Sequence, residues 1–273
     1  MGFSLTAYGV ALHRYVHLIY DESPIIVDDD VIERLLNDDI KRNVMNTREK
    51  YLTREMCALR AHVLIRSRFT EDVITEAIKK GTDQVIILGA GLDTCSLRFA
   101  PKHNEVKFYE IDKPDSQAEK KRLIGQSDIR LPGNVVFIPT DFEDESLKDR
   151  MIENGIEFRK KAVISWLGVT MYLSKEAVKE TLAVCAKFQK ESKIVLTYAN
   201  SENGSKRIEQ RAAAAGELWM SKFSDQEISE LIAEVGFRKG YVVDPGTILQ
   251  RYFVERHDNL RMPRRLNIAV GET

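Results

Sequence analysis

The feature that most constrains the fold is a series of short apolar runs separated by stretches long enough for a helix. A strand that is apolar on both faces must be covered on both faces, so such runs are typical of a parallel sheet between two layers of helices. Runs of this kind predict strands at residues 84–88, 106–111, 135–138, 161–166 and 193–199. Two later candidates lie at 239–243 and 264–270. The expected fold is therefore a doubly wound, mostly parallel α/β sheet of about seven strands.

Helical patterns fill the gaps between these runs. The segments "DSQAEKKRLIGQ", "DESLKDRMIENG" and "SKEAVKETLAVCAKFQK" are long enough for crossover helices. After residue 200, "SDQEISELIAEVGF" predicts a helix with Ser224 as its N-cap and Gly236 near its end. The crossovers and the strands together are the alternation expected of a doubly wound fold.

Residues 1–80 predict helices and no strand. "DDDVIERLLNDD" has an acidic start, and "REKYLTREMCALRAHVLIRSRFTEDVITEAIKKG" predicts a long helical region with a break near Ser67 and an end at Gly81. No repeat or linker-like tract divides the chain. We expect a single domain spanning 1–273, with a helical cap at 1–80, a ligand-binding core at 81–199 and a closing segment with the final strands at 200–273.

Charge and cysteine content exclude several classes of protein. Lysine and arginine number 41 against 42 acidic residues, which argues against a general nucleic-acid partner. No stretch approaches the roughly 20 apolar residues needed to span a bilayer, so no membrane association is expected. Cys57, Cys95 and Cys185 lie far apart and lack metal-ligand spacing. Unpaired cysteines suit a reducing compartment, and we expect a cytoplasmic protein. Nothing in the sequence indicates an oligomeric state.

The first strand of the predicted sheet runs directly into the triplet Gly89, Ala90 and Gly91. Ligands of such sheets bind beyond the carboxyl ends of the strands, where the strand order reverses. Glycines there allow a tight turn and close approach of the backbone to a ligand. An ordinary strand-to-helix turn explains the same residues, so the triplet alone does not decide between the two.

The second strand ends in Asp112, about 20 residues after the glycines, where a carboxylate can bind ribose hydroxyls. A strand-end cap before Pro114 is the structural alternative. Taken together, loop and acid favour an adenosine-type ligand. A dinucleotide site would need a third glycine near Thr94, and its absence weakens a nicotinamide-dependent oxidoreductase as an interpretation. A phosphate-binding P-loop is excluded because no Gly-Lys-Ser/Thr follows.

The third strand leads into Asp141 and Phe142, a carboxylate and an aromatic ring at the same edge of the sheet. Such a pair can accept a hydrogen bond from an adenine amino group and pack on its ring. An N-cap aspartate followed by a core phenylalanine is the alternative.

The run "RSRFTEDVITEAIKKGTDQVIILGAGLDTCSLRF" resembles the leucine carboxyl methyltransferase-like family of S-adenosylmethionine-dependent methyltransferases. The resemblance continues through "FYEIDKP", "IPTDFEDESL", "SWLGVTMYL" and "AAAAGELWMSKFSDQEISELIAEVGF", and covers about residues 10 to 270. It implies a Rossmann-like methyltransferase sheet with an N-terminal helical cap, and S-adenosylmethionine as cofactor. Bacterial members of this family include O-methyltransferases of small molecules.

The resemblance also implies roles for single residues. The loop Gly89–Gly91 would cradle the methionine part of the cofactor, Asp112 would bind the ribose, and Asp141 with Phe142 would flank the adenine. An arginine of "RSRF" would pair with the cofactor carboxylate, which a planar guanidinium suits. We expect Arg68 in this role, with Arg66 as second choice.

Two further positions bear on this assignment. Arg14 is a weaker candidate for the same carboxylate, and a helix-end or surface cation is the alternative for each arginine. Leu167 stands where many family members have a glutamate, so no role of that glutamate is carried over to this chain. Backbone carbonyls of residues 165–167 could contact the cofactor ammonium instead.

The catalytic residues are not evident from the sequence. A carboxylate acceptor needs no general base, whereas a hydroxyl acceptor needs one, and none of the five histidines stands in a recognisable catalytic setting. His13 and His17 have helical spacing but no third ligand nearby, so no metal is expected. Cys95 is expected to be a small buried residue and not a nucleophile.

The expected function is O-methylation of a small-molecule carboxylate or hydroxyl. Alternatives are a protein C-terminal carboxyl methyltransferase and a non-catalytic S-adenosylmethionine-binding protein. Several apolar residues could line the acceptor pocket, although core packing explains them equally well: Trp166, Met171, Tyr172, Tyr198, Trp219 and Met220.

Overall fold

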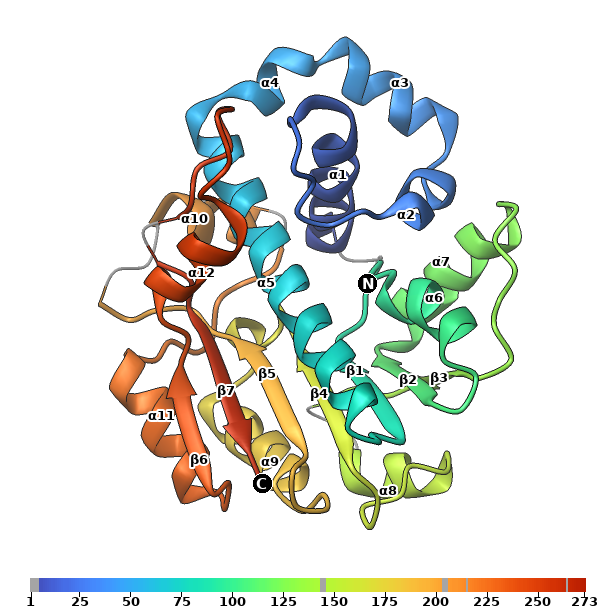
Figure 1. Ribbon diagram of the computed structural model, residues 1–273, viewed down its shortest axis with the longest axis vertical. Coiled ribbons are helices and arrows are strands. Elements are labelled where there is room, and N and C mark those ends of the chain that lie inside the picture. The colour runs from blue at the N-terminus through green and yellow to red at the C-terminus, as the bar shows by residue number, and fades with distance from the viewer. Residues whose placement is uncertain (1–4, 143–145, 203–205, 215, 264) are drawn as a thin grey trace.

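The fold is built on one sheet with the strand order β3-β2-β1-β4-β5-β7-β6. The computed structural model describes residues 5–142, 146–202, 206–214, 216–263 and 265–273. The strands are β1 (Gln84–Leu88), β2 (Lys107–Asp112), β3 (Val135–Pro139), β4 (Ala162–Trp166), β5 (Lys193–Thr197), β6 (Lys239–Val242) and β7 (Ile268–Glu272). Strands β1 to β5 pair in parallel, and β7 is antiparallel to β5 and β6. The predicted mostly parallel, seven-stranded α/β sheet is confirmed (Figure 1).

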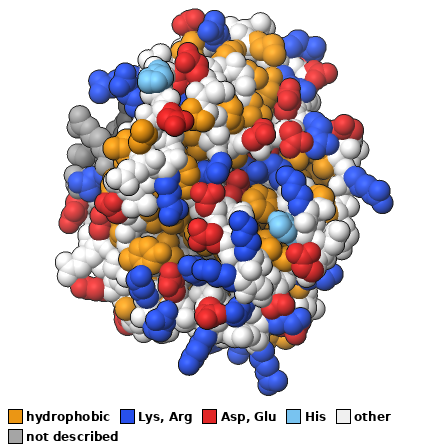
Figure 2. Space-filling view, in the orientation of Figure 1, with side chains coloured by type: hydrophobic (Ala, Val, Ile, Leu, Met, Phe, Trp, Pro, Cys, Tyr) orange, Lys and Arg blue, Asp and Glu red, His pale blue; other side chains and the backbone are white. Residues whose placement is uncertain are grey.

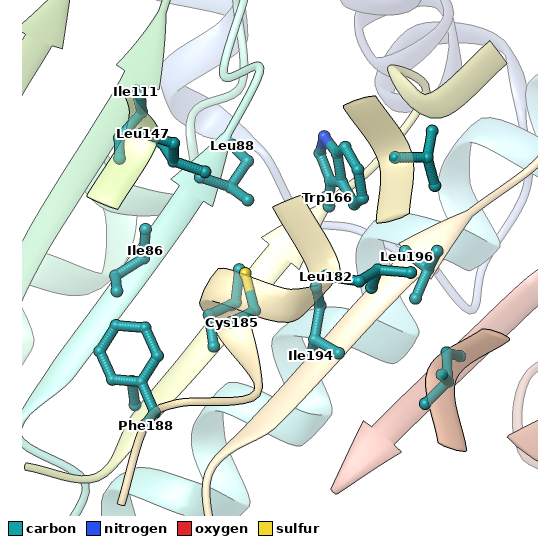
Figure 3. Close-up of a cluster of buried hydrophobic side chains, with 14 of the residues drawn as sticks. Ile86, Leu88, Ile111, Leu147, Trp166, Leu182, Cys185, Phe188, Ile194 and Leu196 are labelled. Atoms are coloured by element: carbon teal, nitrogen blue, oxygen red, sulfur yellow. The ribbon is translucent and has the colours of Figure 1, made fainter. Parts of the chain in front are cut away.

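Both faces of the sheet are covered, because alternate residues of each strand point to opposite layers. Ile86 and Leu88 of β1 belong to a core cluster shared with the helices α8 (Leu147–Glu153), α9 (Lys175–Cys185) and α11 (Asp225–Glu234). Figure 3 shows this cluster, with Trp166 of β4 packed near Leu182 and Leu196. The fully apolar strands of the sequence are thus explained by burial on two sides.

The other face is covered by α5 (Arg54–Lys79), α6 (Cys95–Phe99) and α7 (Pro114–Gly125), and α5 differs from the sequence prediction. It is one continuous helix through Ser67, which is buried within it. The helix begins where the Thr53 hydroxyl accepts a hydrogen bond from the Met56 amide. The polar stretch around Ser67 therefore does not interrupt the helix, and α5 belongs to the core as much as to the cap.

The cap lies above the carboxyl edge of the sheet (Figure 1). It consists of α1 (Leu5–Tyr20), α2 (Asp30–Leu35), α3 (Asp38–Asn46) and α4 (Arg48–Leu52). Asp29 and Asn37 each cap the helix that follows, by accepting from the amides of Ile32 and Ile40. Such caps satisfy amide groups that have no partner within the helix.

The closing segment contains α10 (Lys206–Ala214), α12 (Pro245–Tyr252) and the last two strands, while the short 3-10 helices η1 (Ala100–Lys102) and η2 (Thr170–Tyr172) lie earlier. The predicted Ser224 N-cap is confirmed as a capping box with Glu227. Strand β7 begins four residues later than the predicted run, after Asn267 with its φ of 48°.

Across the described residues, every helix is too short or too polar to cross a membrane. Figure 2 shows acidic and basic side chains interspersed over one face.

Candidate functional site

Two loops meet at the point where the strand order reverses, between β1 and β4. Gly89 ends β1 with a φ of 65°, and its amide donates to the carbonyl of Ile111 at 2.7 Å. A Cβ at this position would lie 2.2 Å from Cγ2 of Val169, in the loop after β4. Both the backbone conformation and the contact with Val169 therefore require glycine, and a role of the loop in binding a ligand stays a prediction.

Helix α1 lies directly on this loop. Gly91 has a φ of 47°, and a Cβ there would lie 3.2 Å from the Cβ of Ala7. Ala90, between the two glycines, is buried. The loop backbone is thus enclosed between the sheet and the cap.

Asp112, at the end of β2, holds the loop in place. Its two carboxylate oxygens accept from the amides of Gly91, at 2.5 Å, and Lys113, at 2.7 Å. Burial raises the pKa of the Asp112 carboxyl, although these amides and nearby lysines oppose that rise. The carboxylate keeps part of its surface accessible at the ligand edge. Its role in binding a ribose stays a prediction.

Asp141 and Phe142 follow β3, which is the neighbour of β2. Oδ2 of Asp141 lies 3.0 Å from Nζ of Lys113, and Phe142 is half-buried against the main core cluster. The glycine loop, Asp112 and this pair therefore share the carboxyl edge of adjacent strands β1, β2 and β3, as predicted for one elongated ligand. Their proposed contacts with adenine are untested.

Arg68, the preferred partner for the cofactor carboxylate, is occupied by contacts within the protein. Its Nε lies 2.8 Å from Oδ1 of Asp72, and its Nη1 donates to the carbonyl of Ile26 at 3.0 Å. Its guanidinium also lies over the ring of Tyr252, 5.8 Å from the centroid. These contacts fix Arg68 between α5, α12 and the cap loop.

Arg66, the second choice, has a different environment. Within the described part of the chain, no carboxylate forms an ion pair with it. Its guanidinium lies against the backbone of Gly168, where a Cβ would come within 2.8 Å of Nη1. Burial, with a smaller effect of the charge on Arg14, lowers the pKa of Arg66 to about 10, and Tyr172 and Asp93 offset this only in part. The contacts of Arg68 are therefore satisfied within the protein, whereas Arg66 has no ion-pair partner among the described residues.

Arg14 is fully buried and already paired. Its Nε lies 2.8 Å from Oδ2 of Asp29, and its Nη1 lies 3.3 Å from Oδ2 of Asp93, which follows the glycine loop. Asp29 also pairs with Arg98 of α6 at 3.2 Å. Arg14 therefore joins α1 to the glycine loop and is a weak candidate for binding a ligand carboxylate.

Tyr172 lies in η2, directly after the loop that follows β4. Thr6 of α1, Trp219 and Glu217 surround its hydroxyl, and burial raises the pKa of Tyr172. The amide of Met220 donates to the carbonyl of Met171 at 2.7 Å, which fastens residues 217–221 over the loop after β4. Nε1 of Trp219 is buried and lies near the hydroxyl of Tyr172.

Not all predicted pocket residues take part. Trp166 and Tyr198 are 0% and 2% exposed and belong to the main core cluster, so they are core residues. Leu167 is half-buried against the cluster on the α5 side of the sheet. Met171, Tyr172, Trp219 and Met220 remain as lining candidates.

The sequence analysis also considered His17 as a metal ligand and Cys95 as a nucleophile, and both side chains are buried. Nδ1 of His17 lies 2.8 Å from Asp21, and its Nε2 accepts from the amide of Ile26. In the described residues no group of three histidine, cysteine or acidic side chains could hold a metal. Cys95 is buried, and burial raises the pKa of its thiol well above the usual value. A thiol that resists ionisation is a poor nucleophile, as expected.

Sequence reasoning did not single out His62. This α5 residue lies one turn before Arg66, and its Nε2 is 2.8 Å from the carbonyl oxygen of Leu266. The four-residue spacing to Arg66 was visible in the sequence, but Leu266 lies 204 positions away. The contact that orients the ring therefore became apparent only in the tertiary structure.

Comparisons with known proteins identify relatives of this chain in sequence and in fold. The sequence profile of the family described as "Leucine carboxyl methyltransferase" matches residues 7–186. The chain is 30% identical to the putative S-adenosyl-L-methionine-dependent methyltransferase YktD of Bacillus subtilis, over 94% of this chain and 93% of that protein. A putative methyltransferase from Thermobifida fusca has a similar fold, with a TM-score of 0.58 and 17% identity over 88% of this chain and 92% of that one.

Proposed function

The chain belongs to the leucine carboxyl methyltransferase family and is an S-adenosylmethionine-dependent methyltransferase, and from this premise we propose that it methylates an oxygen atom of a small molecule. S-adenosylmethionine supplies a methyl group already activated by the positive charge on sulfur. The protein then contributes mainly binding, alignment and exclusion of water.

The residues at the carboxyl edge suit this cofactor. We assign the cofactor carboxylate to Arg66, because a deeply placed guanidinium without an ion-pair partner in the described residues gains most from an anion. We assign the methionine part of the cofactor to the glycine loop. The carboxylate of Asp112 would accept hydrogen bonds from the ribose hydroxyls, and Asp141 and Phe142, after the next strand, would contact the adenine.

We choose a small molecule as the acceptor because two segments of the chain cover the acceptor side of the site. Helix α1 contacts the glycine loop at Ala7, and Met220 is hydrogen-bonded to Met171 across the loop after β4. A protein C-terminus needs an open groove for the chain that precedes it, whereas a small acceptor needs none. The buried N–H of Trp219 and the hydroxyl of Tyr172 suit an oxygen-bearing acceptor.

The cofactor assignment is tested by calorimetric titration with S-adenosylhomocysteine. Arg66→Ala should weaken binding about 10- to 100-fold, since a charge-assisted hydrogen bond contributes about 1.5–3 kcal/mol. Arg68→Ala is the matched control, because it removes the same charge two residues away on the same helix, and it should change affinity less than about threefold. The reverse order of effects would return the assignment to Arg68.

The acceptor class is tested with radiolabelled S-adenosylmethionine and a cell extract separated by size. Label should enter the low-mass fraction as a solvent-extractable product. Label that stays with protein as a base-labile ester would support the protein carboxyl methyltransferase alternative instead. Cofactor binding without transfer to either fraction would point to a non-catalytic binding protein.

A further inference from the structure

His62 occupies a position between α5 and the segment before β7 that suits proton transfer. It is crowded by surrounding atoms, yet the side chain keeps part of its surface accessible. His62 lies one helical turn before Arg66, so the two side chains lie on the same side of α5.

The tautomer of His62 follows from its hydrogen bond. Carbonyl oxygens accept and do not donate, so Nε2 of His62 must carry a proton to bond to Leu266 at 2.8 Å. The neutral ring then presents an unprotonated Nδ1. This nitrogen bonds to no atom of the described residues, and it is not sealed from solvent. A fixed ring with a free lone pair is the arrangement required of a general base.

The electrostatic surroundings keep the ring neutral. Burial and then the charge of Arg66 lower the pKa of His62 to about 4, against a smaller opposing effect of the Leu266 carbonyl. An anion bound to Arg66 would offset that charge and so raise the pKa of His62. Cofactor binding thus prepares the ring to accept a proton.

His13 is the other histidine near Arg66, and it is less suited. It is 4% exposed, and its Nδ1 is sealed without a hydrogen-bond partner in the described residues. Its ring lies edge-on to Tyr51 at 6.5 Å. Of the two histidines, only His62 combines a fixed tautomer with a partly accessible side chain.

We propose that His62 is the general base of the reaction and that the acceptor is an acidic hydroxyl, such as a phenol or enol, and not a carboxylate. This inference rests on the proposed O-methylation. The acceptor oxygen bonds to the methyl carbon while the carbon–sulfur bond breaks and its electron pair stays on sulfur. The hydroxyl proton passes to Nδ1 of His62 and then to water. The products are a methyl ether, S-adenosylhomocysteine and one proton.

The test uses His62→Gln, whose amide can still donate to Leu266 but which has no basic nitrogen. Methyl transfer is measured with naphthol and with a nitrophenol that is largely ionised at the assay pH. The variant should lose about 100-fold or more in kcat with naphthol and less than about fivefold with the nitrophenol, with an unchanged KM for S-adenosylmethionine. His103→Gln, a partly exposed histidine beside Glu105, is the control and should match the wild type.

Equal losses on both phenols, full activity on naphthol, or wild-type preference for naphthoate over naphthol would overturn the proposal. If no phenol is methylated, NMR of the imidazole nitrogens decides. His62 should be the Nε2–H tautomer, its pKa should rise when S-adenosylhomocysteine binds, and naphthol should shift its signal. A missing shift or the opposite tautomer would reject His62 as the base.

Calorimetry separates this proposal from the one on which it rests. If wild-type protein does not bind S-adenosylhomocysteine, the cofactor assignment fails irrespective of His62. If the wild type and His62→Gln bind it equally, the kinetic and NMR results concern the base alone.

Discussion

The guanidinium of Arg66 lies against the backbone of Gly168, close enough that a Cβ on the glycine would come within 2.8 Å of Nη1. Gly168 also has a φ of 76°, and its amide donates to the hydroxyl of Thr197 at 2.7 Å. The loop after β4 thus forms one wall for the cation that we assign to the cofactor carboxylate. A change in the loop should therefore alter ligand binding without touching the arginine.

Gly168→Ala should weaken S-adenosylhomocysteine binding by about tenfold or more, because the new methyl displaces Arg66. The left-handed conformation should also cost about 1–2 kcal/mol of unfolding free energy. Calorimetry and urea unfolding measure the two effects. Gly125→Ala is the control, since a Cβ there meets no atom within 4 Å and the φ of Gly125 lies outside the left-handed region. Unchanged affinity in Gly168→Ala would show that Arg66 moves freely.

Gly89→Ala should destabilise the protein by more than about 2 kcal/mol, from backbone strain and from the contact with Val169. Val169→Ala in the same chain should recover part of this loss, because it removes the Cγ2 atom that the new methyl meets. Urea unfolding of both single variants and the double variant gives the coupling free energy. Strict additivity would mean that the two loops are not in contact.

Asp29→Asn should lower the unfolding free energy by about 3–5 kcal/mol, because it removes the charge that pairs with buried Arg14 and Arg98. The amide can still cap α2, so loss of the cap is not the cause. Asp30→Asn is the matched control. Its exposed pair with Arg34 should contribute less than about 1 kcal/mol. Similar losses in both variants would mean that the effect arises at the N-terminus of α2 and not from the ion pairs with Arg14 and Arg98.

Acid should destabilise the protein through its buried histidines. Burial lowers the pKa of His13 to about 3 and that of His62 to about 4, from 6.5 in the unfolded chain. Between pH 6.5 and about 4 the unfolded state therefore binds more protons, and stability falls as the pH falls. Each histidine contributes a slope of up to about 1.4 kcal/mol per pH unit.

The pH effect is measured by urea unfolding between pH 7 and pH 5. His13→Gln should flatten the dependence by up to about 1.4 kcal/mol per unit below pH 6. The charged groups that act on His13 are Arg60, Arg66, Asp21 and Lys50, and these remain in the variant. Glu110 and Asp112 oppose the trend, since burial raises their pKa values. A variant with the wild-type slope would show that His13 is protonated in the folded protein.

Local patterns in the sequence were enough to locate most of the sheet. Predominantly apolar runs coincide with β1 to β5 to within two residues, because a strand buried on both faces is mostly apolar. The Ser224 cap follows from chemistry within four residues of chain. The glycine loop and Asp112 were recognisable for the same reason, since their types and spacing along the chain carry the signal.

The remaining features of the fold and of the candidate site depend on contacts between residues that are distant along the chain. Nothing local distinguishes Arg66 from Arg68, and only the tertiary contacts show that Asp72 and Tyr252 occupy one of them. The same holds for the continuity of α5 through Ser67, and for the orientation of His62 by a carbonyl 204 residues away. The sequence by itself determined which segments form strands and where a nucleoside-type ligand could bind. Which cation is left without a partner, and which histidine nitrogen is left unprotonated, depends on long-range contacts that only the folded structure creates.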